Sequence, residues 1–249
     1  QAGPQHEALH IAVASDHGHA TITGHRDVRA ALDGFDDCTL LPGGSGGFMV
    51  PGGDAGRIAA LAEFLTRQDW CGAVYAADGA IDRAVGGAVG GARLPPGVLP
   101  RSALLADHAR AAHVLFTLRT DPGPSALGLP GTTLYDGGLP LGGGTHGGLS
   151  AAELHTVLML GGGMIRRGGV SEWPAGLTDI APTVLALLGL DGGAAMDGRV
   201  LREAFAEGAD PTDSPAAENW DARGAGGYTQ RLARTRLGRH VYLDRGVRE

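Results

Sequence analysis

The sequence predicts an α/β fold in which helices cover both faces of a layered sheet. Short apolar runs typical of strands alternate with segments of helical periodicity along the 249 residues. Hydrophobic residues make up 43% of the chain, which is typical of a globular protein rather than a disordered one. The 44 glycines and 14 prolines indicate long connections between the elements. We expect one partial domain over residues 1–249, with a Gly-rich loop or insert region at about 39–100.

The first expected elements are a strand and a short helix. Residues 9–14 (LHIAVA) are almost all apolar, which predicts a short buried strand that ends just before Asp16 and His17. Residues 26–32 read as a short helix, and the Gly- and Pro-rich residues 39–53 read as a loop.

The clearest helix is expected after Asp54, which is a suitable N-cap, and should extend to about Arg67. Its apolar residues recur at helical spacing on one face: Ile58, Leu61, Ala62 and Leu65. A strand should follow at 72–77, and the Gly/Ala/Pro-rich residues 84–97 should form a mobile connection.

In the middle of the chain, residues 102–112 read as a helix that leads into a strong strand at 113–118 (HVLFTL). Residues 121–148 have many glycines and no clear periodicity, which predicts a long loop carrying His146. A further strand is expected at 156–160. Because binding and catalytic residues concentrate on long loops, His146 becomes a candidate site residue.

Towards the C-terminus, a helix should begin at Thr178-Asp179 and run to Leu188. Pro182 lies in its first turn, where the missing N–H costs little, and Gly189 can end it. Residues 207–227 are polar and Gly-rich, which predicts a surface excursion. We expect a basic helix or turn from Tyr228 to Arg239 and a last strand at 241–243.

Charge and composition exclude several classes of function. The net charge of −7 argues against a nucleic-acid-binding surface. Every one of the 20 residues counted as Lys or Arg is an arginine, so a P-loop lysine and a lysine Schiff base are both excluded. No apolar run approaches the ~20 residues of a membrane span. The two cysteines, Cys38 and Cys71, are too few for a disulfide framework.

Asp16, His17 and His146 are the candidate metal ligands. Asp16 and His17 follow an apolar strand, and in a layered sheet such a position lies at the edge where ligands bind. Carboxylate oxygen and imidazole nitrogen are donors that suit Zn²⁺. Taken alone, the pair has a simpler interpretation, in which Asp16 caps a turn and His17 is a structural histidine. His19 could support a ligand or face a substrate, or it could be structural.

Four motifs, in order, resemble those of the alkaline phosphatase superfamily, and most of all its nucleotide pyrophosphatase/phosphodiesterase branch. The sequence over residues 14–19 (ASDHGH) resembles the Ser-Asp-His-Gly signature, and residues 144–148 (GTHGG) resemble the later Gly-x-His-Gly motif. The stretch 178–189 (TDIAPTVLALLG) is similar to the family's C-terminal helix, and residues 196–199 (MDGR) resemble the segment that comes after that helix. The resemblance spans roughly residues 9–203.

The resemblance implies an alkaline phosphatase-like layered sheet whose N-terminal part is missing. It also implies two divalent metal ions, commonly zinc, with Asp16 and His17 binding one and His146 binding the other. The remaining ligands and the Thr or Ser nucleophile come from an earlier part of the family's chain, so no catalytic nucleophile is assigned here. With its ligand set incomplete, this chain is expected to bind metal weakly and to lack turnover by itself.

The function implied for the complete protein is metal-dependent hydrolysis of phosphodiesters or phosphomonoesters. The expected partners are a small phosphate-ester substrate and the missing N-terminal half or another subunit. A sulfatase or phosphonate hydrolase of the same superfamily would share the ligands. A non-catalytic metal- or partner-binding module is the alternative from another class. Because a truncated α/β sheet exposes an unpaired strand edge, a solitary chain should self-associate.

Overall fold

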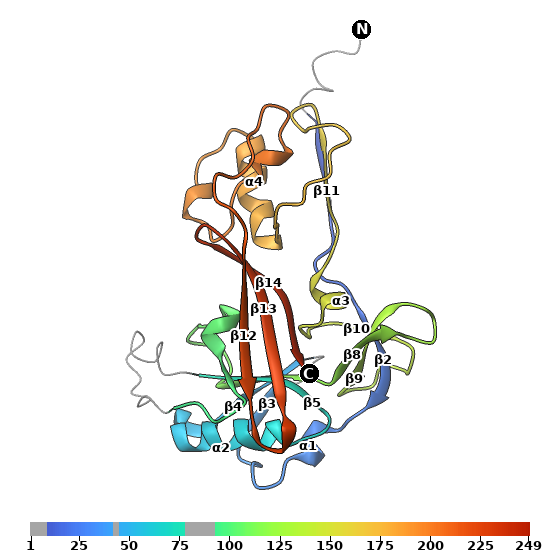
Figure 1. The fold of residues 1–249 in the computed structure, drawn as a ribbon, viewed down its shortest axis with the longest axis vertical. Coiled ribbons are helices and arrows are strands. Elements are labelled where there is room, and N and C mark those ends of the chain that lie inside the picture. Colours follow the sequence, from blue (N-terminus) through green and yellow to red (C-terminus); the bar gives the residue numbers. More distant parts are fainter. Residues whose placement is uncertain (1–8, 42–44, 78–92) are drawn as a thin grey trace. The chain divides into compact units, whose positions relative to one another are not determined.

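A computed structural model of the protein describes residues 9–41, 45–77 and 93–249 (Figure 1). The described residues fall into two compact units. The first unit takes 9–16, 156–218 and 234–242, and the second takes 17–155, 219–233 and 243–249. The predicted mixed α/β class is confirmed, although the strands form four sheets instead of one layered sheet. Within the described ranges, no helix is long and apolar enough to cross a membrane.

A five-stranded sheet with the order β3-β4-β7-β5-β6 carries the main apolar core of the second unit. The strands are β3 Thr39–Leu41, β4 Ser45–Met49, β5 Cys71–Ala76, β6 Leu99–Pro100 and β7 Val114–Leu118. β3 and β4 lie where a loop was expected, so that prediction is wrong. The glycines that suggested a loop are needed for packing, because a Cβ at Gly46 would overlap the ring of Phe116.

The expected helix after Asp54 is confirmed as α2, Ala55–Thr66. The Asp54 carboxylate accepts a hydrogen bond from the Arg57 backbone N–H at 2.6 Å, which caps the first turn. The four apolar residues predicted for its inner face are all buried. The earlier helix, α1 Val28–Ala31, is shorter than expected and is capped by Asp27. Cys38 and Cys71 are both buried free thiols.

The helix expected at 102–112 is not formed. A short 3₁₀ helix ends at Leu104, and Leu105 has a left-handed φ of 57°, which stops further winding. Arg101 is buried and donates to the Ala112 carbonyl at 2.6 Å, holding the following turns against it. Residues 78–92, which include most of the expected mobile connection, lie outside the described residues. Over the described ranges, the 3₁₀ helices are Pro51–Gly53, Arg101–Leu104, Leu177–Asp179, Gly193–Ala195, Arg202–Ala204 and Ala225–Gly227.

A second sheet of the second unit, with the order β10-β2-β9-β8, occupies much of the region predicted as a long loop. Its strands are β2 Ala20–His25, β8 Thr120–Pro124, β9 Pro130–Tyr135 and β10 Gly144–Thr145. β2 pairs parallel with β9 and antiparallel with β10. These strands are short and rich in Gly, Pro and Thr, so their sequences carry little apolar alternation, and β2 pairs with strands more than 100 residues away in the chain.

The first unit contains a two-stranded antiparallel ribbon, β1 His10–Ala14 with β11 Leu158–Gly162, and the helix α4 Ile180–Leu187. The strand and helix expected here are confirmed, but the expectation that β1 is buried is wrong. Ile11 is 57% exposed and Val13 is 53% exposed. Among the described residues, β1 has only β11 as a strand neighbour, so its apolar side chains lack the covering that the pattern predicted.

The third sheet, β12-β13-β14, includes residues 228–239, for which a basic helix or turn was expected, so that prediction is wrong. Its strands are β12 Ala216–Arg223, β13 Thr229–Leu237 and β14 His240–Arg248. In β13 the buried residues alternate, with Gln230, Leu232 and Arg234 inward, which is the period of a strand. Gln230 bonds the backbone N–H and carbonyl of Val74 at 2.9 and 2.8 Å, fixing β13 beside β5 in the second unit.

Protonation of Glu218 should weaken the first unit in acid. The Arg236 and Arg234 side chains donate to its carboxylate at 2.5 and 2.6 Å and hold its pKa below the usual value. A carboxyl whose folded-state pKa is lowered stabilises the fold at neutral pH and loses that contribution as pH falls through the folded pKa. Urea denaturation at pH 7 and at about pH 3 should therefore show a smaller acid loss in Glu218→Gln than in the parent chain. Equal losses would contradict the role given to Glu218.

Candidate functional site

Three histidines from two distant segments meet in the second unit. The rings of His17 and His146 stack with their centroids 3.7 Å apart and their planes 19° from parallel. The His19 ring lies edge-on to both, with its centroid 5.0 Å from that of His17 and 5.7 Å from that of His146. His19 and His146 are exposed and His17 is half-buried, so the cluster is open to solvent.

The pairing of β2 with β10 explains why these histidines meet. In the antiparallel register, Thr145 lies opposite Ala20. His19 directly precedes β2 and His146 directly follows β10, so the next pair along the ladder is the two histidines. A Cβ at Gly144 would lie 3.2 Å from the His19 ring, which is tight, so glycine there leaves room for that ring.

Gly18 ties the His17 segment to α3, Ala151–Leu154. Its backbone N–H donates to the Glu153 carbonyl at 2.7 Å. A Cβ at Gly18 would overlap the carbonyl oxygen of Ala152, so no other residue fits without moving the backbone. The glycine between His17 and His19 therefore permits a close approach of two backbones that sets where both imidazoles lie.

Glu153 fixes the loop that carries His146. This carboxylate is 3% exposed and accepts hydrogen bonds from the Gly148 N–H at 2.8 Å and the Ser150 hydroxyl at 2.7 Å. With the Ser150 backbone N–H it forms a capping box at the start of α3. Glu153 was not among the residues predicted from the sequence, although the spacing Ser150-x-x-Glu153 is the signature from which it could have been predicted.

The His17 ring is held by its neighbour. Its Nδ1 lies 2.9 Å from the Gly18 carbonyl oxygen, so in the tautomer with the proton on Nδ1 the ring donates to that carbonyl. The other ring nitrogen, Nε2, is then an acceptor with a lone pair in the ring plane. A histidine oriented in this way through one nitrogen is the arrangement found at most histidine metal ligands.

The described ligand set is incomplete for a metal ion. Asp16, the remaining predicted ligand, is exposed and is the last residue of the first unit's opening segment, whereas the histidine cluster belongs to the second unit. Over the ranges that the structure describes, no three side chains of His, Cys, Asp or Glu are arranged so that together they could hold a metal ion. The cluster thus offers imidazole nitrogens as ligands, and a metal ion bound there would need further ligands from other residues.

The other two motifs pack together in the first unit. Asp179 is fully buried and accepts hydrogen bonds from the backbone N–H groups of Gly176 at 2.9 Å and Arg199 at 2.7 Å. The Arg199 side chain forms a bidentate pair with the buried Glu203 at 2.9 and 2.6 Å. Asp179 therefore has a structural role in joining the two motifs, although its side chain makes no capping hydrogen bond to α4.

No protein-family model matches the chain, and no curated protein matches its sequence significantly. A functional assignment therefore depends on the motifs and on the geometry of the histidine cluster.

Proposed function

We propose that the complete protein hydrolyses phosphodiesters or phosphomonoesters with two divalent metal ions, such as zinc. Asp16 and His17 would hold one ion and His146 the other. The four motifs that resemble the alkaline phosphatase superfamily motivate this assignment. The observation that carries it is the stacked pair of His17 and His146, because two segments 129 residues apart bring the two predicted histidine ligands into contact.

The geometry of the stack favours two ions over one. The lone pairs of an imidazole lie in the plane of its ring, and the two planes are only 19° from parallel with centroids 3.7 Å apart. Such lone pairs do not converge on a single ion. His17 and His146 would therefore each hold a separate ion, and two ions together would supply charge stabilisation to a transferring phosphoryl group.

In this proposal, neighbouring residues of the chain hold the metal-ligating histidines in position. The Gly18 carbonyl orients His17, Glu153 fixes the loop of His146, and the exposed His19 faces the same open site, where it could contact a substrate. When bound, the metal ions would stabilise negative charge on a transferring phosphoryl group. A partner polypeptide would supply the nucleophile and the missing ligands. Sulfate and phosphonate esters are the alternative substrates, because a sulfatase or phosphonate hydrolase of the same superfamily would share these ligands.

Zinc binding is expected to be weak and to depend on both stacked histidines. Loss of either imidazole should weaken it by at least about tenfold, because a site short of ligands loses one of its few donors. Isothermal titration calorimetry of Zn²⁺ into the parent chain, His17→Ala and His146→Ala checks this. His155→Ala is the matched control, since His155 is an exposed histidine of the same unit outside the cluster. Equal zinc affinity in all of these proteins would contradict the ligand roles.

The chain by itself should not hydrolyse bis(p-nitrophenyl) phosphate in the presence of Zn²⁺, because no nucleophile is assigned to it. Asp16→Ala is assayed beside it. If the parent chain hydrolyses the substrate, a chelator stops the reaction and Asp16→Ala is inactive, the proposed need for a partner polypeptide is overturned. It would mean that an unassigned nucleophile, or a residue of another subunit, completes the site. Zinc binding that never leads to turnover, even with a polypeptide carrying a Thr or Ser nucleophile, would favour a non-catalytic module.

A further inference from the structure

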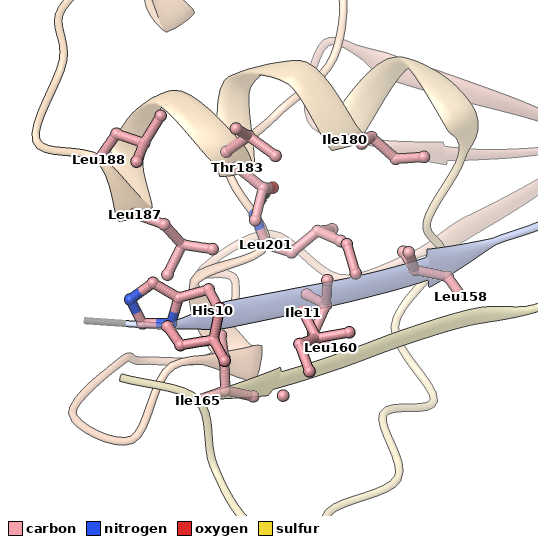
Figure 2. A pocket seen from close by; sticks show the side chains of 14 residues that line it. His10, Ile11, Leu158, Leu160, Ile165, Ile180, Thr183, Leu187, Leu188 and Leu201 are labelled. Atoms are coloured by element: carbon pink, nitrogen blue, oxygen red, sulfur yellow. Dashed lines mark hydrogen bonds between the residues drawn. The ribbon is translucent and has the colours of Figure 1, made fainter. Parts of the chain in front are cut away.

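An apolar cavity lies within the first unit, between the β1–β11 ribbon and α4 (Figure 2). Its volume is about 240 Å³, and none of the residues that line it is charged. Ile165 and Leu201 on its wall are 6% and 4% exposed, whereas Leu160 and Leu187 are half-buried. A ligand in the cavity would therefore cover leucine side chains that the rest of the described chain leaves partly open.

The lining residues follow the ribbon and the helix over similar lengths. Along the ribbon they run from His10 to Leu158, which pairs with Ala14, so they span about 14 Å of strand. Along α4 they run from Ile180 to Leu187, about 10 Å of helix. Figure 2 shows α4 along the ribbon, with Leu187 above His10 at one end and Ile180 above Leu158 at the other. The cavity is therefore elongated.

The volume of the cavity sets the size of its ligand. A dry apolar cavity of about 150 Å³ holds benzene, so about 240 Å³ has room for about eight to ten carbon atoms. Because the space is elongated, an extended alkyl chain fits it better than a compact ring system does.

One of the two polar side chains on the wall has unused hydrogen-bonding capacity. The hydroxyl of Thr183 accepts a hydrogen bond from the Leu201 N–H at 3.0 Å. The Nδ1 atom of His10 is buried and has no hydrogen-bond partner among the described residues. Buried polar groups are normally hydrogen-bonded, and a few polar groups on an apolar wall fix the orientation of a ligand. His10 therefore marks the place of the ligand's polar end.

A hydroxyl is the ligand group that fits this polar end. A neutral imidazole has one donor and one acceptor nitrogen, and a hydroxyl both donates and accepts, so the two can bond in either tautomer. A carboxylate buried in an apolar site needs a cation beside it. The cavity wall has no Arg, and the chain carries a net charge of −7, so an uncharged ligand is favoured.

We propose that this cavity binds a straight-chain alcohol of about eight to ten carbon atoms, with the alkyl chain along α4 and the hydroxyl at His10. Burial of the alkyl chain supplies the affinity, and the hydrogen bond to His10 sets the direction of the chain. The cavity belongs to the first unit and the histidine cluster to the second, so this inference does not rest on the proposed phosphoesterase function.

Isothermal titration calorimetry with the primary alcohols hexanol, octanol, decanol and dodecanol tests the size of the site. Each added CH₂ group that enters the cavity should tighten binding roughly three- to fourfold. Affinity should rise as far as octanol or decanol and then stop rising, because a longer chain leaves carbon atoms in water. Affinity that keeps rising through dodecanol would assign binding to an open apolar surface and overturn the proposal, as would the absence of binding at every length.

Octanoate and the variant His10→Phe test the polar end. At about pH 8 octanoate should bind at least about tenfold more weakly than octanol, because the cavity offers its charge no partner. His10→Phe keeps an aromatic ring but loses the hydrogen bond, and it should weaken octanol binding about two- to tenfold. Octanoate that binds as tightly as octanol overturns the preference for an uncharged ligand, and unchanged octanol affinity in His10→Phe overturns the role of His10.

Ala12→Phe tests the location of the site. Ala12 lines the cavity opposite Leu160 and is exposed, so a phenyl ring there would fill the cavity without displacing packed atoms. Octanol affinity should fall at least about tenfold, because the ring takes the space of the alkyl chain. Ala14→Phe is the matched control, since Ala14 is exposed on the same face of β1 and does not line the cavity. Equal octanol affinity in the two variants overturns the location.

Discussion

Replacing Gly18 with alanine should destabilise the second unit by about 3 kcal/mol. The added Cβ would overlap the Ala152 carbonyl oxygen, which is backbone at the start of α3 and cannot rotate away as a flexible side chain could. Relief of the overlap requires the His17 segment to separate from α3, which would lengthen the 2.7 Å hydrogen bond from the Gly18 N–H to the Glu153 carbonyl.

Urea denaturation of Gly18→Ala, followed by circular dichroism, measures this loss. Gly56→Ala is the matched control, because Gly56 lies exposed in α2, where its Cβ would meet only Asp54 Oδ1 at 3.4 Å. Alanine is the better helix former, so the control should be neutral or stabilised by up to about 1 kcal/mol. A Gly18→Ala protein as stable as the parent would show that the contact with α3 is looser than described.

Gly18→Ala also tests whether Gly18 positions the histidine cluster for zinc binding. If the close approach at Gly18 positions His17 beside His146, the folded Gly18→Ala protein should bind zinc more weakly than the parent chain, while Gly56→Ala should not. This outcome would separate the positioning of the histidines from their chemistry, since both imidazoles remain present. Unchanged zinc affinity in a destabilised Gly18→Ala protein would mean that α3 supports the fold without setting the geometry of the cluster.

Elements with a strong local signal were predictable from the sequence. α2 has a capping residue at Asp54 and apolar residues at helical spacing, and both act within a single segment. β13 was misread as a basic helix because its arginines suggested a charged helical face. Its strand character depends on partners far away in the chain, such as the Val74 backbone, which bonds the Gln230 side chain across 156 residues. Sequence spacing alone cannot reveal such partners.

The candidate site was likewise predictable only where its signal is local in the sequence. His17 and His146 could be selected because each lies in a short motif that resembles a known one, and the structure brings their rings together. The groups that hold them were not identified. The capping box at Ser150 and Glu153 is local and could have been found, but the contact of Gly18 with Ala152 joins segments more than a hundred residues apart. The burial of β1 was mispredicted because a continuous apolar run is typical of a strand covered on both faces, whereas β1 pairs with β11 in a two-stranded ribbon.

Replacing Asp179 with alanine should cost the first unit about 3 kcal/mol. The carboxylate is fully buried and accepts hydrogen bonds from the backbone N–H groups of Gly176 and Arg199, and both of these part-buried donors would lose their partner. Each unsatisfied buried donor costs about 1–3 kcal/mol. The change should therefore loosen the start of α4 and its connection to the Arg199 segment together.

Two further variants make this result specific. Asp179→Asn keeps one carbonyl oxygen as an acceptor and should lose about half as much stability as Asp179→Ala. Asp191→Ala changes an exposed aspartate just after α4 and should lie within about 0.5 kcal/mol of the parent chain. If Asp179 is structural, zinc titration of folded Asp179→Asn should match the parent chain, because its oxygens are already engaged by backbone donors. A loss of zinc affinity with little loss of stability would instead make Asp179 a metal ligand, and the proposed ligand set of Asp16, His17 and His146 would need revision.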